Sequence, residues 1–372
     1  MTKNTTPGVK SYRDWLESPE GKKIVLENLG KSGMPLELKA RKSLKNHNFQ
    51  ATNARYFDAT SPEADPEDPT QDGLWREIDI WASRREANAP RVMGCDIQLY
   101  TNIIAECKYS SDREILFFEH PDPADADLSR FPLFVNGHNL LPTRPVDCFE
   151  VPVLAERAME VQKDNASREK DNYSDRTIHV ACEQMMAATK YFIGRWRGEC
   201  RRLYSDVLNN SEIGRRWHAL ENSGKIKYEA DGPVKKVPSV FKEKFIKDNY
   251  APALLKDFPF IPIELYIPIL ITDENRGIIK VDLDEALNPI DLLDMGACFY
   301  VYISENANRY DEVLDEAFAL PIIISSLTKL PDILESINAG VEKLKREIAG
   351  LVAANPSLLI KEILFNEHLF HV

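Results

Sequence analysis

Apolar residues recur along this chain with two spacings, one typical of helices and the other typical of strands. Leu36, Ala40 and Leu44 lie four residues apart and predict one apolar stripe on a helix over residues 36–47. Similar patterns predict further helices at 10–30, with a cap or break at 18–21, at 177–208 and at 330–351.

Alternating or continuous apolar runs, rich in β-branched and aromatic residues, predict strands elsewhere in the chain. They occupy residues 48–60, 74–85, 96–110, 113–120, 261–273, 277–284, 297–304 and 320–327. Pro and Gly occur among the ten residues between 74–85 and 96–110, so these two strands are expected to form a hairpin. A second hairpin is expected to join 261–273 to 277–284.

The middle of the chain, residues 121–175, is long, contains proline and has little periodicity. Its charged end, 156–176, is expected to form helix and mobile loop. The order of elements predicts an α/β (α+β) fold, in which helices flank a mixed central sheet that carries insertions. We expect a main domain at 33–330 with an insertion at about 121–175, between helical segments at 1–32 and 331–372.

Composition favours a globular protein of the cytoplasm. The 372 residues are 43% hydrophobic, and no run reaches the roughly 18 apolar residues that a membrane span needs. The N-terminus lacks the apolar core of a secretory signal. Six cysteines are scattered without a CxxC pair, which favours reduced thiols over a structural zinc site. The net charge of −12 counts against nonspecific binding of nucleic acid unless basic surface is local.

Charged residues of both signs interrupt the two strands of the first predicted hairpin. Strand parity places Glu77 and Asp79 on one face, and Glu106 and Lys108 on one face of the next strand. If the strands pair, Asp79 lies opposite Glu106 and Lys108. Two carboxylates at this separation suit Mg²⁺, and a lysine beside them can orient or help to deprotonate a water molecule.

Other interpretations of the same residues stay open at this stage. A Glu-x-Lys tripeptide is frequent in charged proteins and can be a surface salt bridge, and Glu77 is expected to be a solvated neighbour rather than a ligand. Parity turns Cys107 to the opposite face, which favours a buried core cysteine over a nucleophile. Catalysis requires the carboxylates of Asp79 and Glu106 to lie close together, near Lys108 and open to solvent.

Asp79 followed by Glu106-Cys107-Lys108 on an adjacent strand resembles the PD-(D/E)xK nuclease superfamily. The resemblance implies a restriction-endonuclease-like fold for 33–330, with Asp79 and Glu106 as ligands of Mg²⁺, for which Mn²⁺ can substitute. It also implies supporting roles for Glu37, on the helix before the motif, and for Gln184, on the long helix after it. The implied activity is endonuclease cleavage of DNA in restriction or antiviral (anti-phage) defence, by a homo-oligomer or with a partner protein.

Basic residues gather in three segments, at 39–45, 195–202 and 235–247, and the first two flank the predicted site in chain order. They could follow a phosphate backbone or be solvated helix faces. The candidates for contact with nucleic acid are Arg41, Lys42, Lys45, Arg195 and Arg197. The alternative to a nuclease is a non-catalytic nucleic-acid-binding or assembly protein with a nuclease-like fold. A scaffold with ordinary ion pairs is a third interpretation.

Overall fold

The structure is a computed structural model of the chain. It describes residues 18–31, 33–57, 75–92, 95–109, 113–119, 133–135, 149–150, 153–162, 176–210, 215, 219, 222–223, 229–231, 234–236, 260–274, 276–283, 289–303 and 319–354.

One mixed sheet of 12 strands organises the described residues. The main path of neighbouring strands is β1-β2-β4-β10-β14-β13-β7-β5-β11-β12, while β3 pairs with β4 and β6 pairs with β10. These strands are β1 Gln50–Phe57, β2 Trp75–Arg85, β3 Arg91–Val92, β4 Cys95–Lys108, β5 Arg113–Glu119, β6 Leu133–Val135, β7 Leu154–Gln162, β10 Phe260–Thr272, β11 Ile278–Leu283, β12 Pro289–Asp294, β13 Ala297–Ile303 and β14 Ala319–Ser326. A separate pair joins β8 Glu229–Asp231 to β9 Val234–Lys236.

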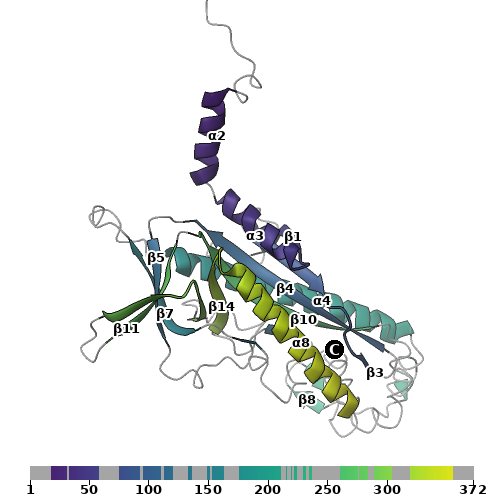
Figure 1. The fold of residues 1–372 in the computed structure, drawn as a ribbon. Helices are drawn as coiled ribbons and strands as arrows, with labels where there is room; N and C mark the ends of the chain where they lie inside the picture. The colour runs from purple at the N-terminus through teal and green to yellow at the C-terminus, as the bar shows by residue number, and fades with distance from the viewer. Residues whose placement is uncertain are drawn as a thin grey trace, which may run out of the picture.

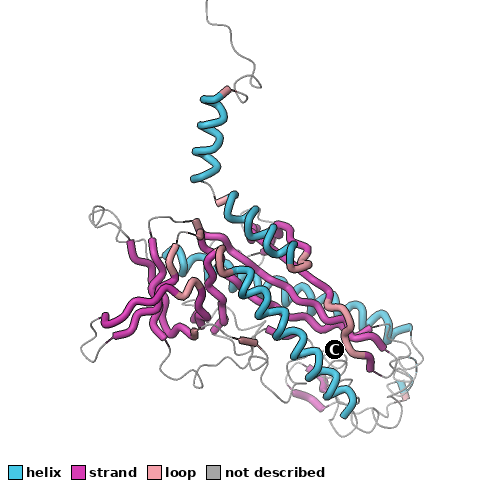
Figure 2. The backbone as a smooth tube through the Cα atoms, in the orientation of Figure 1, coloured by secondary structure: helices cyan, strands magenta, loops and turns pink. Residues whose placement is uncertain are grey.

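Helices cover both faces of the sheet, which makes the fold a mixed α/β arrangement (Figures 1 and 2). The long helix α4, Arg176–Asn210, lies across β4 and β10 on one face. On the other face lie α3, Met34–Asn46, and α8, Leu330–Ala354. The helix α2, Pro19–Lys31, precedes α3 and extends away from the sheet (Figure 1). The predicted sheet flanked by helices is therefore confirmed.

Local sequence signals account for the helices. Leu36, Ala40 and Leu44 are all buried, as the predicted stripe on α3 requires. Ser18 caps α2, because its Oγ accepts a hydrogen bond from the backbone N–H of Gly21 at 3.0 Å. None of the helices in the described part of the chain is long and apolar enough to cross a membrane.

The centre of the sheet is buried on both faces. Strands β4 and β10 run parallel in a continuous ladder, from Asp96 opposite Phe260 to Lys108 opposite Thr272. On the α4 side, Ile104 of β4 and Tyr266 of β10 belong to a cluster of buried residues, which α4 completes with side chains such as Met185. This core fixes α4 against the strand that carries Glu106 and Lys108.

Strand β2 contains one residue more than its neighbour β1 requires. Thr52 pairs with Trp81 and Ala54 pairs with Ile78, so two steps along β1 match three steps along β2. The extra residue is a β-bulge at Asp79 and Ile80, which breaks the alternation of faces along β2. Asp79 lies near Glu106 despite the bulge, as the sequence analysis expected.

Two sequence predictions fail in the second half of the sheet. The predicted strands at 261–273 and 277–284 both form, but they are not a hairpin, because β10 lies between β4 and β14 while β11 lies between β5 and β12. The charged stretch expected to be helical begins as strand β7, which pairs with β5 and β13. The rest of that stretch, 163–175, lies outside the described residues.

The predicted insertion at 121–175 supplies two strands, β6 and β7, to the main sheet.

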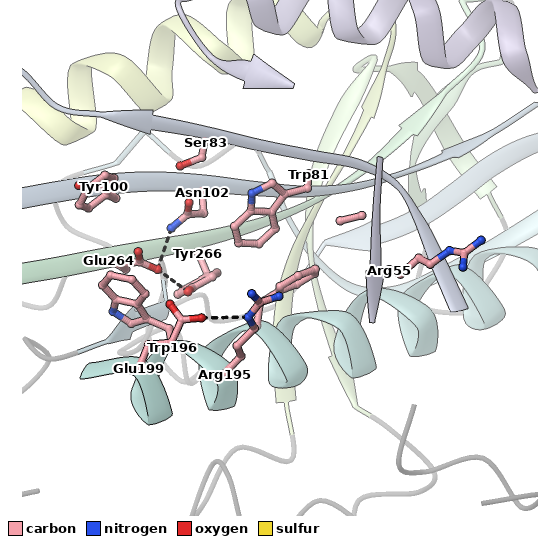
Figure 3. Close-up of a pocket in the computed structure, with 12 residues that line it drawn as sticks. Arg55, Trp81, Ser83, Tyr100, Asn102, Arg195, Trp196, Glu199, Glu264 and Tyr266 are labelled. Atoms are coloured by element: carbon pink, nitrogen blue, oxygen red, sulfur yellow. Dashed lines mark hydrogen bonds and ion pairs between the residues drawn. The ribbon is translucent and has the colours of Figure 1, made fainter. Parts of the chain in front are cut away.

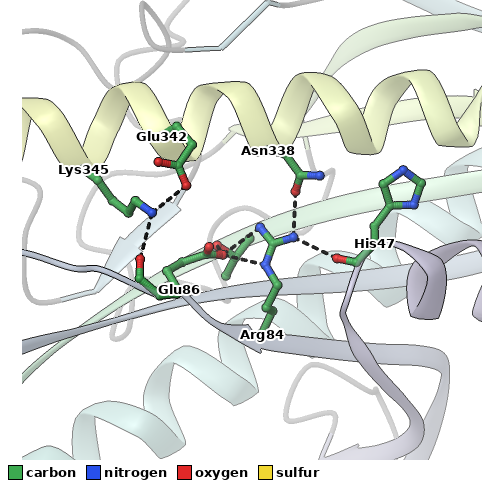
Figure 4. A network of polar contacts seen from close by, with 8 residues as sticks. His47, Arg84, Glu86, Asn338, Glu342 and Lys345 are labelled. Atoms are coloured by element: carbon green, nitrogen blue, oxygen red, sulfur yellow. Dashed lines mark hydrogen bonds and ion pairs between the residues drawn. The ribbon is translucent and has the colours of Figure 1, made fainter.

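At the other end of the chain, a polar network connects α8 to β2 (Figure 4). There Arg84 donates hydrogen bonds to Glu86 at 2.8 and 2.9 Å, to the carbonyl of His47 at 2.9 Å and to Asn338 of α8 at 2.7 Å. The Glu86 carboxylate also accepts a hydrogen bond from Thr101 at 2.6 Å.

Candidate active site

The structure brings together the residues that the motif singled out. Lys108 Nζ lies 3.0 Å from Glu106 Oε2, on the same strand, and 3.4 Å from Gln184 Oε1 on α4. The carboxyl group of Asp79 lies close enough to Glu106 for its charge to raise the pKa of the Glu106 carboxyl. Strand β2, strand β4 and helix α4 therefore contribute to one polar cluster.

The cluster lies where β2 and β4 separate. Their antiparallel ladder runs from Arg85 opposite Tyr100 to Ile80 opposite Ala105, after which β4 continues beside β10. The carboxylate of Asp79 extends across the opening, and its Oδ2 accepts a hydrogen bond from the backbone N–H of Cys107 at 2.8 Å. This bond replaces a lost ladder bond and holds the Asp79 carboxylate beside Glu106.

Glu106 is the most perturbed group in the cluster. Glu106 is 3% exposed. The pKa of its carboxyl is raised to about 7, mainly by burial and to a smaller extent by the charge of Asp79. The Lys108 ammonium lowers that pKa and so offsets part of the effect. The sequence analysis expected Glu106 to be open to solvent, and this expectation is wrong. Strand β10 and helix α4 enclose this end of β4, so Glu106 is buried. Lys108 and Asp79 are only partly buried.

Helix α3 adds a third carboxylate. The pKa of Glu37 is raised by partial burial and by the charge of Asp79, which places the two side chains near each other. Arg41, one turn further along α3, lies 3.7 Å from Glu37 and donates a hydrogen bond to the backbone carbonyl of Asp79 at 2.6 Å. Glu77 instead forms an exposed ion pair with Arg55 at 3.1 Å, which agrees with its predicted role as a neighbour.

The donor set determines which cation could fit. The described residues contain no group of three or more His, Cys, Asp or Glu side chains arranged around one point. Two carboxyl groups this close together can share a hard cation, which favours oxygen ligands. Mg²⁺ needs only one or two protein carboxylates, because it retains several water molecules. Asp79 and Glu106 fit that requirement.

The basic residues differ in how they relate to this cluster. On α3, Arg41 points toward the cluster, while Lys42 and Lys45 are exposed. On α4, Arg195 is exposed and forms an ion pair with Glu199 at 3.0 Å, three turns beyond Gln184. The side chain of Arg197 lies outside the described part of α4. The exposed lysines give α3 a local positive surface near the cluster, despite the acidic chain.

A pocket of about 560 Å³ lies on the α4 side of the sheet, between the strands and that helix (Figure 3). The sequence analysis did not predict it. At its floor, the Glu264 carboxylate accepts hydrogen bonds from Asn102 at 3.1 Å and from the hydroxyl of Tyr266. Burial raises the pKa of Glu264 to about 7. A charged residue in the apolar run at 261–273 was a signal that could have found this pocket.

Comparisons of the chain with protein-family models, with curated proteins and with solved structures gave no match.

Proposed function

We propose that the chain is a Mg²⁺-dependent endonuclease, which hydrolyses phosphodiester bonds in DNA. The observation that carries the proposal is the convergence of Asp79, Glu106, Lys108 and Gln184 from three separate elements. Ion pairs that serve only stability rarely place two carboxyl groups in contact, since each raises the energy of the other. The restriction-endonuclease-like arrangement of the sheet and a role in anti-phage defence belong to the same proposal.

Each residue has a definite task in this reaction. Asp79 and Glu106 would hold the cation, and the Cys107 N–H fixes the direction of the Asp79 carboxylate. The Lys108 ammonium is positioned to orient the attacking water and to neutralise charge on the phosphate, while Gln184 limits its movement. A bound Mg²⁺ would polarise the phosphodiester and lower the pKa of water. Arg41 helps to position Asp79, because its guanidinium donates a hydrogen bond to the backbone carbonyl of Asp79.

The substrate must approach an acidic protein, so local charge determines where it binds. Exposed Lys42 and Lys45 lie on α3, the helix that also carries Glu37 and Arg41. They could contact the phosphates on either side of the scissile bond. A second copy of the chain or a partner protein would supply the rest of the binding surface.

Cleavage assays with purified variants test the proposal directly. Single- and double-stranded DNA and RNA are incubated with wild type, Asp79→Ala or Lys108→Ala, in Mg²⁺, in Mn²⁺ and in EDTA. We expect cleavage of DNA by wild type in either metal, none in EDTA and at least a 100-fold loss in both variants. Glu335→Gln, an exposed change on α8, is the matched control and should cleave like wild type.

One observation favours the alternative of a non-catalytic binding or assembly protein. Glu106 is almost fully buried and already paired with Lys108, as in a structural ion pair. If wild type cleaves nothing in either metal, or if cleavage persists in both variants, Asp79 and Lys108 are not catalytic. If the protein then binds DNA without metal and does not cleave it, that result supports a non-catalytic binding protein.

A further inference from the structure

The pocket between the sheet and α4 has aromatic walls (Figure 3). Trp81 and Tyr266 come from the strands, while Phe192 and Trp196 come from the helix. Trp81 packs against Phe192 with ring centroids 4.2 Å apart, which holds both planes in place. Rigid aromatic surfaces of this kind suit a flat ligand that stacks.

Two polar groups in the pocket, one acceptor and one donor, can form hydrogen bonds with a ligand. The Glu264 carboxylate is 7% exposed and is held by the hydrogen bonds from Asn102 and Tyr266. As an ionised group it can accept further hydrogen bonds from a ligand. The indole N–H of Trp196 is buried and has no acceptor among the described residues. A ligand that carries both a donor and an acceptor would match these two groups.

The pocket lies close to the candidate active site along the same strands. Trp81 is two residues from Asp79 on β2, and Asn102 is four residues from Glu106 on β4. At about 3.3 Å per residue these separations are roughly 7 and 13 Å. That is about two to four nucleotides at roughly 3.4 Å each. Arg195 at the rim adds a cation that can lie near a phosphate.

We propose that this pocket binds an unpaired nucleobase with an exocyclic amino group, in the strand that the enzyme cuts. The base would stack on the aromatic walls and donate its amino hydrogens to Glu264. This inference rests on the proposed nuclease function, since it places the base two to four nucleotides from the cleaved bond. It assigns to the enzyme a preference for single-stranded or flipped-out cytosine, adenine or guanine at that position.

Two oligonucleotides that differ only in their base test the recognition. Fluorescently labelled dodecamers of deoxycytidine and of deoxyuridine are titrated with the full chain at pH 8, in EDTA, and anisotropy is recorded. The two bases differ at C4 and at N3. Cytosine has an amino donor at C4 and an acceptor at N3, whereas uracil has an acceptor at C4 and an N–H donor at N3, so uracil reverses the order of donor and acceptor. We expect wild type to bind the cytosine oligomer at least about tenfold more tightly, as for a hydrogen bond to a charged group.

Variants assign the preference to the pocket. Glu264→Gln should make the two affinities equal, because an amide can turn either its oxygen or its nitrogen to the base. Ser83→Trp fills the pocket from β2 and should weaken binding of both oligomers, which covers the case in which Glu264→Gln folds poorly. Glu335→Gln on α8 should retain the wild-type preference. Circular dichroism verifies that each variant is folded.

The outcomes separate this inference from the nuclease proposal, because binding in EDTA does not depend on cleavage. Equal affinities in wild type, or a preference that survives both Glu264→Gln and Ser83→Trp, overturn the pocket assignment even if DNA is cut in Mg²⁺. A preference that the variants remove, in a protein that never cuts, supports the base site and rejects the nuclease. Deoxycytidine monophosphate that binds as tightly as the oligomer would identify a free nucleotide as the ligand and overturn the strand assignment.

Discussion

The Oδ2 atom of Asp79 lies 2.8 Å from the backbone nitrogen of Cys107, at the point where β2 and β4 part. The carboxylate that would bind a metal thus also satisfies a backbone N–H near the end of a buried strand. Asp79 therefore combines a structural role with the proposed role in metal binding, and substitutions can separate the two.

Asp79→Asn and Asp79→Ala should differ in stability but agree in metal binding. Asparagine retains an acceptor for the Cys107 N–H, whereas alanine leaves that donor unsatisfied at a cost of about 1–3 kcal/mol in the free energy of unfolding. Both variants lose the charge that holds Mg²⁺. Urea unfolding measures the first effect, and the rise in melting temperature with added Mg²⁺ measures the second. Equal stabilities would show that the Cys107 hydrogen bond contributes little.

Binding of Mg²⁺ should weaken as the pH falls through 7. The pKa of Glu106 is about 7, chiefly because of burial and then because of Asp79, so below that pH a proton competes with the cation. Calorimetric titration should give an affinity about tenfold lower at pH 6 than at pH 8, with a proton released at pH 6. Glu106→Gln cannot ionise and should bind weakly at both pH values. A wild-type affinity that is the same at pH 6 and pH 8 would contradict the assignment of Glu106 as a ligand.

Glu264 should make the protein less stable at higher pH. Burial raises its folded pKa from the model-peptide value of 4.5 to about 7, so between these values the folded state holds a proton that the unfolded state releases. Stability therefore falls as the pH rises through this window, by roughly 3 kcal/mol at most. Relative to wild type, Glu264→Gln should gain stability from pH 5 to pH 8 in urea unfolding without divalent metal. The same difference at both pH values would show that Glu264 does not titrate in this range.

Arg84 should contribute far more to stability than Arg91, although each lies 2.6 to 2.9 Å from a carboxylate. Arg84→Ala leaves the buried Glu86 without its cation and should cost about 3–5 kcal/mol in the free energy of unfolding. Arg91 pairs with Asp96 on the surface, so Arg91→Ala should cost under about 1 kcal/mol. Chemical unfolding of the two variants provides the comparison, and similar losses would show that the Arg84 network is not a stabilising unit.

Most elements of the fold could be predicted from local pattern, but their partners could not. The Leu36–Ala40–Leu44 stripe reports directly on one buried helix face. An apolar strand such as β10 shows that both of its faces are buried, yet contains no information about which strands lie beside it. The assumption that neighbours in sequence pair in space therefore failed for β10 and β11. The charged sequence of β7 favours a helix, because this strand is only partly buried in the sheet and lacks a clear apolar alternation.

The candidate site shows the same limit at the level of single residues. Strand parity was enough to bring Asp79, Glu106 and Lys108 into one hypothesis. It could not reveal the bulge, since an extra residue in β2 is defined only by its pairing with β1. Nor could it reveal that Asn102 and Glu264 face each other, because their strands are distant in sequence and meet only through the parallel ladder.

That ladder between β4 and β10 also has a consequence for when the protein becomes competent during synthesis. The hairpin of β2 and β4 can form early, but β4 gains its second neighbour only after β10 has left the ribosome. Contacts so distant in sequence form slowly, since a long loop must close first. The proposed metal ligands therefore acquire their final surroundings only after β10 has been synthesised. Under the proposed nuclease function, a nascent chain would be inactive towards nucleic acids before that point.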